Sequence, residues 1–172
     1  MSVHEEVEEH VHHAQDPFDK IVAGTMAIIA ALLAVVSMLA QRYNTETVLH
    51  QQLASDQWSY YQAKDIRRYV AQTTRDSLSA LKGDQALMSH YADEAAKYRK
   101  QADEIQEKAR EYEAERVKTS RLALHFDFGE VLLEIGIVFS SLAILTKRRV
   151  FFVGGVLSAA AGGLIAAVAH LF

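Results

Sequence analysis

The chain has 172 residues, no cysteine, one proline and a formal net charge of −4. The absence of cysteine excludes thiol catalysis and iron–sulfur binding, and a mild charge without a basic patch argues against a nucleic-acid partner. Three apolar runs lie towards the two ends of the chain and flank a charged middle. This uneven composition predicts an all-α integral membrane protein whose first partner is the lipid bilayer.

Residues 1–16 form an acidic, histidine-rich segment. His10, His12 and His13 lie near Glu6 and Glu9, at spacings that place imidazole and carboxylate groups one helical turn apart, as a zinc or nickel site requires. The alternative is a solvated N-terminal helix, because a histidine tract is only a compositional signal. We expect no metal and no cofactor, and these three histidines are the candidates if a metal site exists.

The first predicted transmembrane helix covers residues 17–40. Asp16 can cap its free amides, and Pro17 suits the first helical position. The run from Ile21 to Ala40 reaches the ~20 residues that a hydrocarbon core of ~30 Å demands. Acidic residues precede it and no small-x-small cleavage pattern follows, so we expect a retained anchor rather than a cleaved signal peptide.

Residues 41–125 are predicted to form an extramembrane helical hairpin with its tip near Gly83, which lies midway between the two ends of this segment. A seven-residue repeat in its second half is typical of a coiled-coil seam. The repeat consists of Tyr91, Tyr98, Ile105, Tyr112, Thr119 and Phe126, with Ala95, Ala102, Ala109 and Ala123 four positions later. A matching stripe of small and β-branched residues in the first half is expected to face it: Ser59, Ala63, Ile66, Val70, Thr73, Ser77 and Ala80. The sequence thus predicts a long antiparallel coiled coil between the first and second spans.

Three aromatic residues, Trp58, Tyr60 and Tyr61, lie off that stripe. They either cover the side of the hairpin or form a contact surface for another copy or another protein, since Trp and Tyr dominate interface anchors.

The second and third transmembrane helices are predicted over residues 126–146 and 150–172. The short basic turn Lys147–Arg149 between them is expected to stay cytoplasmic, which places the N-terminus in the cytoplasm and the hairpin on the opposite side. In the third span, small residues on one face allow close packing against a helix of the same chain or of another copy. These interface candidates are Gly155, Ala159, Gly162 and Ala166.

The second span carries the candidate functional residues Glu130 and Glu134, with Asp127 one turn earlier. An ionisable residue at membrane depth costs roughly 2.5–3.5 kcal/mol on insertion scales and suggests a function. Glu130 has three candidate ion-pair partners at the outer ends of the spans: Arg42, His125 and His170. Glu134 lies deeper and has no Lys or Arg inside any apolar run to pair with. It is therefore protonated, hydrogen-bonded to a serine or the backbone, or turned towards a wet cavity in an oligomer.

Two motifs, QWSYYQAKDIR (57–67) and FDFGEVLLEIGIVFSSLAILTKRR (126–149), carry a resemblance to a known family. The chain resembles the bacterial membrane proteins catalogued as domain of unknown function 4337, over most of its length from the first span onward. Glu130, Glu134 and the Lys147–Arg149 turn coincide with positions of the family pattern. The resemblance implies a small bacterial inner-membrane protein with three spans, and hence a periplasmic hairpin; it brings no activity or cofactor.

No phosphate-binding loop, nucleophile elbow or HExxH motif is present, so we expect no enzyme and no catalytic residue. The leading hypothesis is a structural or accessory protein of the membrane, which forms a homo-oligomer or belongs to a larger membrane complex. The alternative is an oligomer that conducts ions or protons by means of Glu134 and Glu130.

Overall fold

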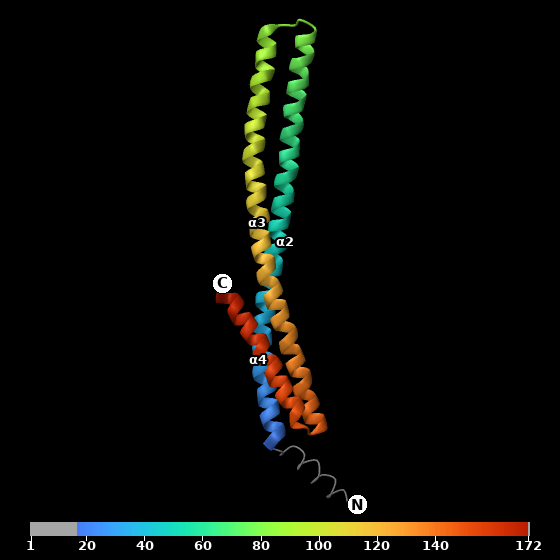
Figure 1. Cartoon of the computed structure of the whole chain (residues 1–172), viewed down its shortest axis with the longest axis vertical. Helices are drawn as coiled ribbons and strands as arrows, with labels where there is room; N and C mark the ends of the chain where they lie inside the picture. The colour runs from blue at the N-terminus through green and yellow to red at the C-terminus, as the bar shows by residue number, and fades with distance from the viewer. Residues whose placement is uncertain (1–16, 172) are drawn as a thin grey trace, which may run out of the picture. The chain divides into compact units, whose positions relative to one another are not determined.

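The computed structural model describes residues 17–171, which form three α-helices: α2 (Pro17–Ala80), α3 (Gln85–Thr146) and α4 (Arg149–Leu171) (Figure 1). No strand occurs among these residues. The all-helical prediction is therefore confirmed, and each helix contains a stretch long and apolar enough to cross a membrane. Because α3 is continuous, one helix carries both the second half of the predicted hairpin and the second predicted span.

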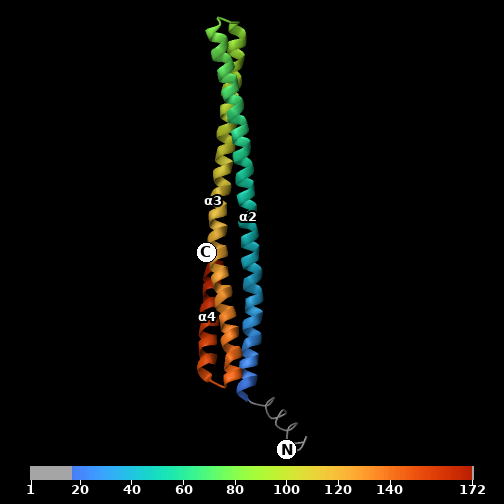
Figure 2. The same cartoon turned by 90° about the vertical axis from the view of Figure 1, so that its right-hand side faces the viewer.

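The chain divides into two compact units. A two-helix unit comprises Thr45–Thr119, where α2 and α3 lie side by side in both views (Figures 1 and 2). A three-helix unit contains α2 up to Asn44, α3 from Ser120 onward, and α4.

In the two-helix unit, a short turn after Ala80 reverses the chain direction. Lys82 adopts a left-handed conformation with φ 50°. The amide of Gly83 donates to the carbonyl of Leu78 at 2.8 Å, and that of Lys82 donates to Ser79 at 3.2 Å, the two bonds of a Schellman motif. Asp84 then caps α3, because its carboxylate accepts from the amide of Ala86 at 2.8 Å. The local sequence thus ends one helix and begins the next within four residues.

The α3 side of the two-helix unit follows the predicted alanine repeat. Ala95, Ala102 and Ala109 are buried, and Thr119 is only 7 % exposed. The hydroxyl of Thr47 on α2 donates to that of Thr119 at 3.1 Å. These small side chains let the two helices approach closely.

The predicted α2 stripe is wrong as a partner for this seam, because all seven of its residues, from Ser59 to Ala80, are exposed. The side of α2 that packs on α3 instead includes the buried Ala54 and Ala71 and the half-buried Tyr61. It also includes long polar side chains: the Lys64 ammonium lies 5.7 Å from the ring centroid of Tyr98 on α3. Apolar spacing in the sequence does not identify this side, because long polar side chains cover the seam with their aliphatic stems.

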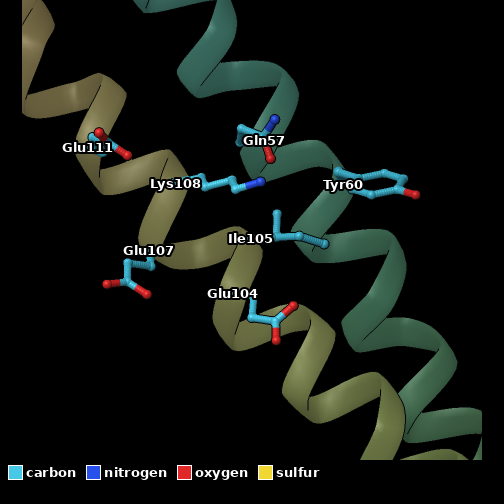
Figure 3. Close-up of a pocket in the computed structure, with 7 residues that line it drawn as sticks. All are labelled: Gln57, Tyr60, Glu104, Ile105, Glu107, Lys108 and Glu111. Carbon is cyan, nitrogen blue, oxygen red and sulfur yellow. The ribbon is translucent and has the colours of Figure 1, made fainter.

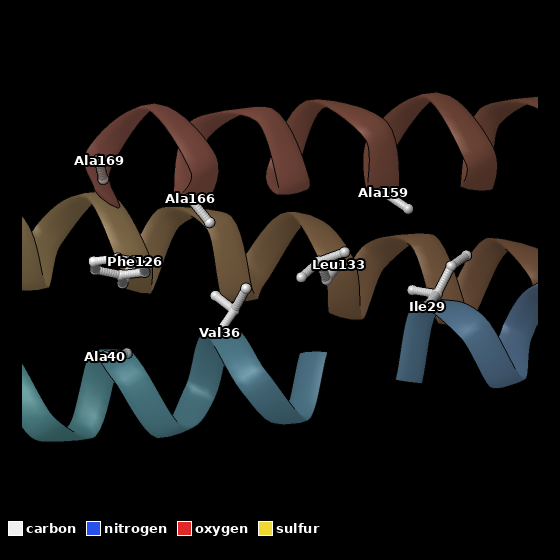
Figure 4. Packing of buried hydrophobic residues seen from close by; sticks show 8 residues of the cluster. All are labelled: Ile29, Val36, Ala40, Phe126, Leu133, Ala159, Ala166 and Ala169. Carbon is white, nitrogen blue, oxygen red and sulfur yellow. The ribbon is translucent and has the colours of Figure 1, made fainter. Parts of the chain in front are cut away.

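The three-helix unit has a core of small and apolar side chains, in which Phe126 and Leu133 of α3 lie between alanines of α4 and Val36 of α2 (Figure 4). Phe126 is 1 % exposed and stacks on Tyr43 of α2, with ring centroids 5.3 Å apart. At the other end of the unit, Lys147 pairs with Asp19. α2, α3 and α4 therefore form one packed bundle.

α3 and α4 approach each other through glycine. A Cβ atom added at Gly162 would lie 2.6 Å from the carbonyl oxygen of Gly129, and one at Gly155 would lie 2.7 Å from that of Gly136. Since real Cβ atoms do not come this close to a carbonyl oxygen, the contact admits hydrogen only. The four interface candidates of the third span, Gly155, Ala159, Gly162 and Ala166, are all buried, and this packing against α3 of the same chain accounts for the two glycines.

Candidate functional site

Glu134 lies on the exposed side of α3 in the three-helix unit. Val131 and Val138, on the same surface, are 50 % and 56 % exposed. Glu134 is eight residues from Phe126 and twelve from the helix end at Thr146, hence about 12 Å and 18 Å along the axis. Within residues 17–171 its carboxylate has no hydrogen-bond or ion-pair partner. An acid therefore projects from the middle of an apolar helical surface.

The serine hydroxyls of the bundle that make hydrogen bonds have other partners. That of Ser140 donates to the carbonyl of Gly136 at 2.8 Å, and that of Ser158 donates to the carbonyl of Leu132 at 2.7 Å. Both bonds lie at the α3–α4 side of the bundle. None of the described residues therefore donates a hydrogen bond to the carboxylate of Glu134.

Asp127, one heptad before Glu134, joins α3 to α2. Its carboxylate accepts a hydrogen bond from the side-chain amide of Asn44 at 3.2 Å. Asn44 was not among the sequence-predicted site residues. It could have been found only by extending the first span's pattern past its apolar end, because Ala23, Ala30, Ser37 and Asn44 recur every seven residues.

The Asn44–Asp127 hydrogen bond shows which side of α2 lies next to which side of α3. Residues one heptad apart share a helical side, so Ser37 and Ala30 follow Asn44 along α2 while Glu134 and Ser141 follow Asp127 along α3. We name this surface the Glu134 face. It consists of Ala23, Ala30, Ser37 and Asn44 of α2 and Asp127, Glu134 and Ser141 of α3, all exposed or half-buried.

Glu130 is half-buried and has no ion-pair partner among the described residues. Of its candidate partners, His125 places Nδ1 2.6 Å from the carbonyl oxygen of Arg121, where the ring nitrogen must donate. Arg42 is exposed, and the side chain of His170 lies outside the described residues. The predicted pairing of Glu130 stays a prediction.

The three aromatic candidates divide between two roles. The indole nitrogen of Trp58 donates to Glu113 of α3 at 2.9 Å, and its ring packs edge-on against Tyr61. Tyr60 is 56 % exposed. Two of the three residues thus pack within the two-helix unit, and Tyr60 faces outward.

Tyr60 lines a hollow of about 550 Å³ in the two-helix unit, which Figure 3 shows. Ile105 and Lys108 point from α3 towards α2, while Glu107 points away. The remaining lining residues are Gln57, Glu104 and Glu111. This open surface of mixed charge is that of a solvated helix pair. Among residues 17–171, no group of three or more His, Asp or Glu side chains is placed to hold a metal ion. His10, His12 and His13 lie outside the described residues.

Glu115 in the two-helix unit gives a prediction about pH. The Lys118 ammonium, 2.6 Å away, donates a hydrogen bond and lowers the pKa of Glu115 below its ordinary value, with a smaller contribution from the charge of His50. A carboxylate with a lowered pKa stabilises the fold above its unfolded pKa and loses that contribution as pH falls through the folded value. We expect Glu115→Gln to lower the melting temperature slightly at pH 7 and not at pH values below the folded pKa.

Thermal melts followed by circular dichroism, at pH 7 and at a pH below the folded pKa of Glu115, measure this difference. Lys118→Gln, which removes the other partner, should give the same small loss at pH 7. A Glu115→Gln effect of equal size in acid would contradict the assignment.

A family model described as a domain of unknown function (DUF4337) matches residues 18–172, which is most of the chain. The chain therefore belongs to this family. No curated protein and no solved structure matches it.

Proposed function

We propose that this member of the family is a structural protein of the membrane, without enzymatic activity, that assembles with further membrane helices through the Glu134 face. Its three-helix unit would span the bilayer, and its two-helix unit would form a coiled-coil stalk outside it. The outward side chains of the three-helix unit support insertion, because large apolar residues are exposed on every helix. They include Ile28, Leu32 and Met38 of α2, Phe128 and Val138 of α3, and Leu157 and Leu164 of α4.

The observation that carries the proposal is the exposure of Glu134. In a bilayer its side chain would face hydrocarbon, at a cost of roughly 2.5–3.5 kcal/mol on insertion scales. No Lys or Arg occurs between Ile21 and Ala40, in residues 126–146 or in residues 150–172, so this chain cannot neutralise it at that depth. A donor from another membrane helix removes this cost.

The neighbouring side of α2 supports the same conclusion. Ala23 and Ala30 present small side chains on the Glu134 face, and small residues let helix backbones approach closely in a membrane. Ser37 adds a hydroxyl to this face. A second copy of the chain, or a helix of a larger complex, would therefore find both a close-packing surface and polar groups.

For location, we propose a bacterial inner membrane with the Lys147–Arg149 turn in the cytoplasm and the two-helix unit in the periplasm. The support is that all three residues of this basic segment lie in the short connection between α3 and α4 or at the first position of α4, since short loops rich in Lys and Arg remain cytoplasmic.

Assembly is tested by the particle mass of the full chain in nanodiscs or mild detergent. We expect the wild type to exceed the mass of one chain. Glu134→Leu, which removes every polar atom, should weaken association by at least about tenfold, because 1.4 kcal/mol corresponds to tenfold and the insertion cost relieved is larger. Glu134→Gln should retain part of the association through its amide.

Glu130→Gln is the matched control, because Glu130 lies about 6 Å nearer the end of the span and can reach the polar interface. It should assemble like the wild type. A wild type that is strictly monomeric, or Glu134→Leu particles of unchanged mass, would contradict the proposal.

A second candidate function is conduction of protons or cations. Ser37 and Ser141 share the Glu134 face, so an assembly that turned this face inward would line its axis with a ring of carboxyl groups and hydroxyls. Proteoliposomes should then show a flux that falls in Glu134→Gln. If vesicles that contain the assembled wild-type protein show no flux, the conduction function is contradicted and only the structural function remains.

A further inference from the structure

The exposed residues of α2 in the two-helix unit include a continuous uncharged stripe. We name it the α2 stripe: Ser59, Ala63, Ile66, Val70, Thr73, Ser77 and Ala80. All seven are exposed, and the two largest, Ile66 and Val70, are 63 % and 60 % exposed. α3 of the same chain does not cover this side of α2.

The spacing of the α2 stripe alternates between four and three residues throughout. This is the spacing of a coiled-coil seam, which requires a second helix with the same period. Around its centre the surface is hollowed, with a volume of about 340 Å³ lined by Ile66, Tyr69, Val70, Thr73 and Thr74 of α2 alone. A neighbouring helix could insert side chains there, as knobs insert into holes.

Charge distinguishes this side from the rest of the two-helix unit. None of the seven positions carries a charge, whereas the exposed surface of α3 carries many, among them Lys97, Lys100, Glu104 and Glu107. A charged helix surface remains in water at little cost. Covering an uncharged helix surface 22 residues long with another helix removes it from water, which is favourable.

We propose that the α2 stripe pairs in parallel with the α2 stripe of a second copy. This inference rests on the proposed membrane anchoring: α2 carries the first span, so copies inserted in one orientation present α2 in the same chain direction. A second copy also offers the same period and the same small side chains, as a symmetric contact requires.

The residues that flank the α2 stripe fit parallel pairing. In a parallel coiled coil each flanking residue meets the residue five positions later on the partner. This brings Gln62 to Arg67 and Tyr69 to Thr74 of the other copy, and Asp76 to Leu81. No like charges meet, and the first pair allows a hydrogen bond to a guanidinium. The two-helix units of two copies would thus form a four-helix arrangement with both α2 helices at the centre.

Single cysteines test the pairing directly, because the chain has none of its own. Ser77→Cys places a thiol in the α2 stripe, and Ser79→Cys places one on an exposed position two residues away, on another side of the helix. With the full-length protein in lipid vesicles under mild oxidation, we expect Ser77→Cys to give an interchain disulfide and Ser79→Cys to give little. Ser59→Cys, at the other end of the stripe, should cross-link like Ser77→Cys.

Direction is tested by mixing Ser59→Cys and Ser77→Cys chains that carry different tags. Parallel pairing predicts 59–59 and 77–77 products, whereas predominant 59–77 products would overturn it. Equal cross-linking at positions 77 and 79, or none at 59 and 77, would overturn the pairing itself.

A charge within the α2 stripe provides a second measurement. Ile66 is exposed, so Ile66→Lys should leave the helix content unchanged by circular dichroism. In the Ser77→Cys background it should reduce the cross-linked fraction by about tenfold, the effect of about 1.4 kcal/mol. An unchanged cross-linked fraction would count against the stripe.

The assembly through the Glu134 face and the pairing through the α2 stripe can be contradicted independently of each other. A full cross-link in Ser77→Cys combined with Glu134→Leu supports the α2 stripe whatever happens at the Glu134 face. An assembly that remains intact by mass but gives no cross-link at position 77 overturns the α2 stripe alone.

Discussion

Phe126→Ala is expected to destabilise the three-helix unit by about 3–5 kcal/mol, the cost of truncating a fully buried phenylalanine. Phe126 is 1 % exposed and lies in the core that joins all three helices, stacked on Tyr43. Removing its ring leaves a cavity between α2 and α3 and an unpaired aromatic face. Unfolding in mixed micelles with increasing dodecyl sulfate, followed by circular dichroism, measures the change in free energy.

Phe128→Ala is the control for this substitution. Phe128 lies two residues away on the same helix and is 64 % exposed, so its truncation should change the unfolding free energy by no more than about 0.5 kcal/mol. Equal effects of the two variants would show that Phe126 is not a core residue.

Gly162→Ala is expected to cost about 1–3 kcal/mol, although it adds a single methyl group. That methyl carbon would lie 2.6 Å from the carbonyl oxygen of Gly129 and 2.9 Å from the Cβ atom of Leu132. A backbone carbonyl cannot turn aside, so α4 must move away from α3. The same micelle titration measures the loss.

The adjacent Gly163 provides a matched control, because nothing lies within 4 Å of the Cβ atom that Gly163→Ala would add. This variant should be neutral or more stable by up to about 1 kcal/mol, the difference in helix propensity between alanine and glycine. If both variants behaved alike, the α3–α4 contact would be looser than described.

The helices could be predicted from the sequence because their signals are strong. The apolar runs are long enough to predict spans, and the Tyr/Ala repeat predicted the buried side of α3 down to Ala95, Ala102 and Ala109. The position of the turn also followed from Gly83. Its mechanism did not, since the left-handed residue is Lys82 and not the glycine.

The α2 side of the helix pair could not be predicted from apolar spacing. The stripe from Ser59 to Ala80 has the better apolar pattern, yet α3 packs against the side that bears Tyr61 and Lys64. Hydrophobic periodicity identifies a helix surface that is suited to packing, but it does not identify the helix that packs against it. Sequence periodicity does not distinguish a helix surface that packs within the chain from one that stays exposed.

The candidate site was predicted in part. Glu134 is a candidate from its predicted depth and from the lack of a Lys or Arg inside the apolar runs. Its exposure is known only from the structure, because spacing alone does not show which neighbour a helical face meets. Similarly, the small residues of α4 predicted close packing, and only the structure shows α3 of the same chain as the neighbour of Gly155 and Gly162.

The two-residue turn between α3 and α4 has a consequence for biogenesis. α3 ends at Thr146 and α4 begins at Arg149, so the helix that bears Glu134 is followed at once by the 23 residues that pack on it. At ribosomal rates of 5–20 residues per second, α4 is complete about one to five seconds after α3. In the proposed membrane arrangement, the glycine contacts would then form between helices that enter the bilayer together. α3 is therefore expected to be integrated as half of a pair, and a stop codon placed after Thr146 should yield a chain that quality-control proteases remove.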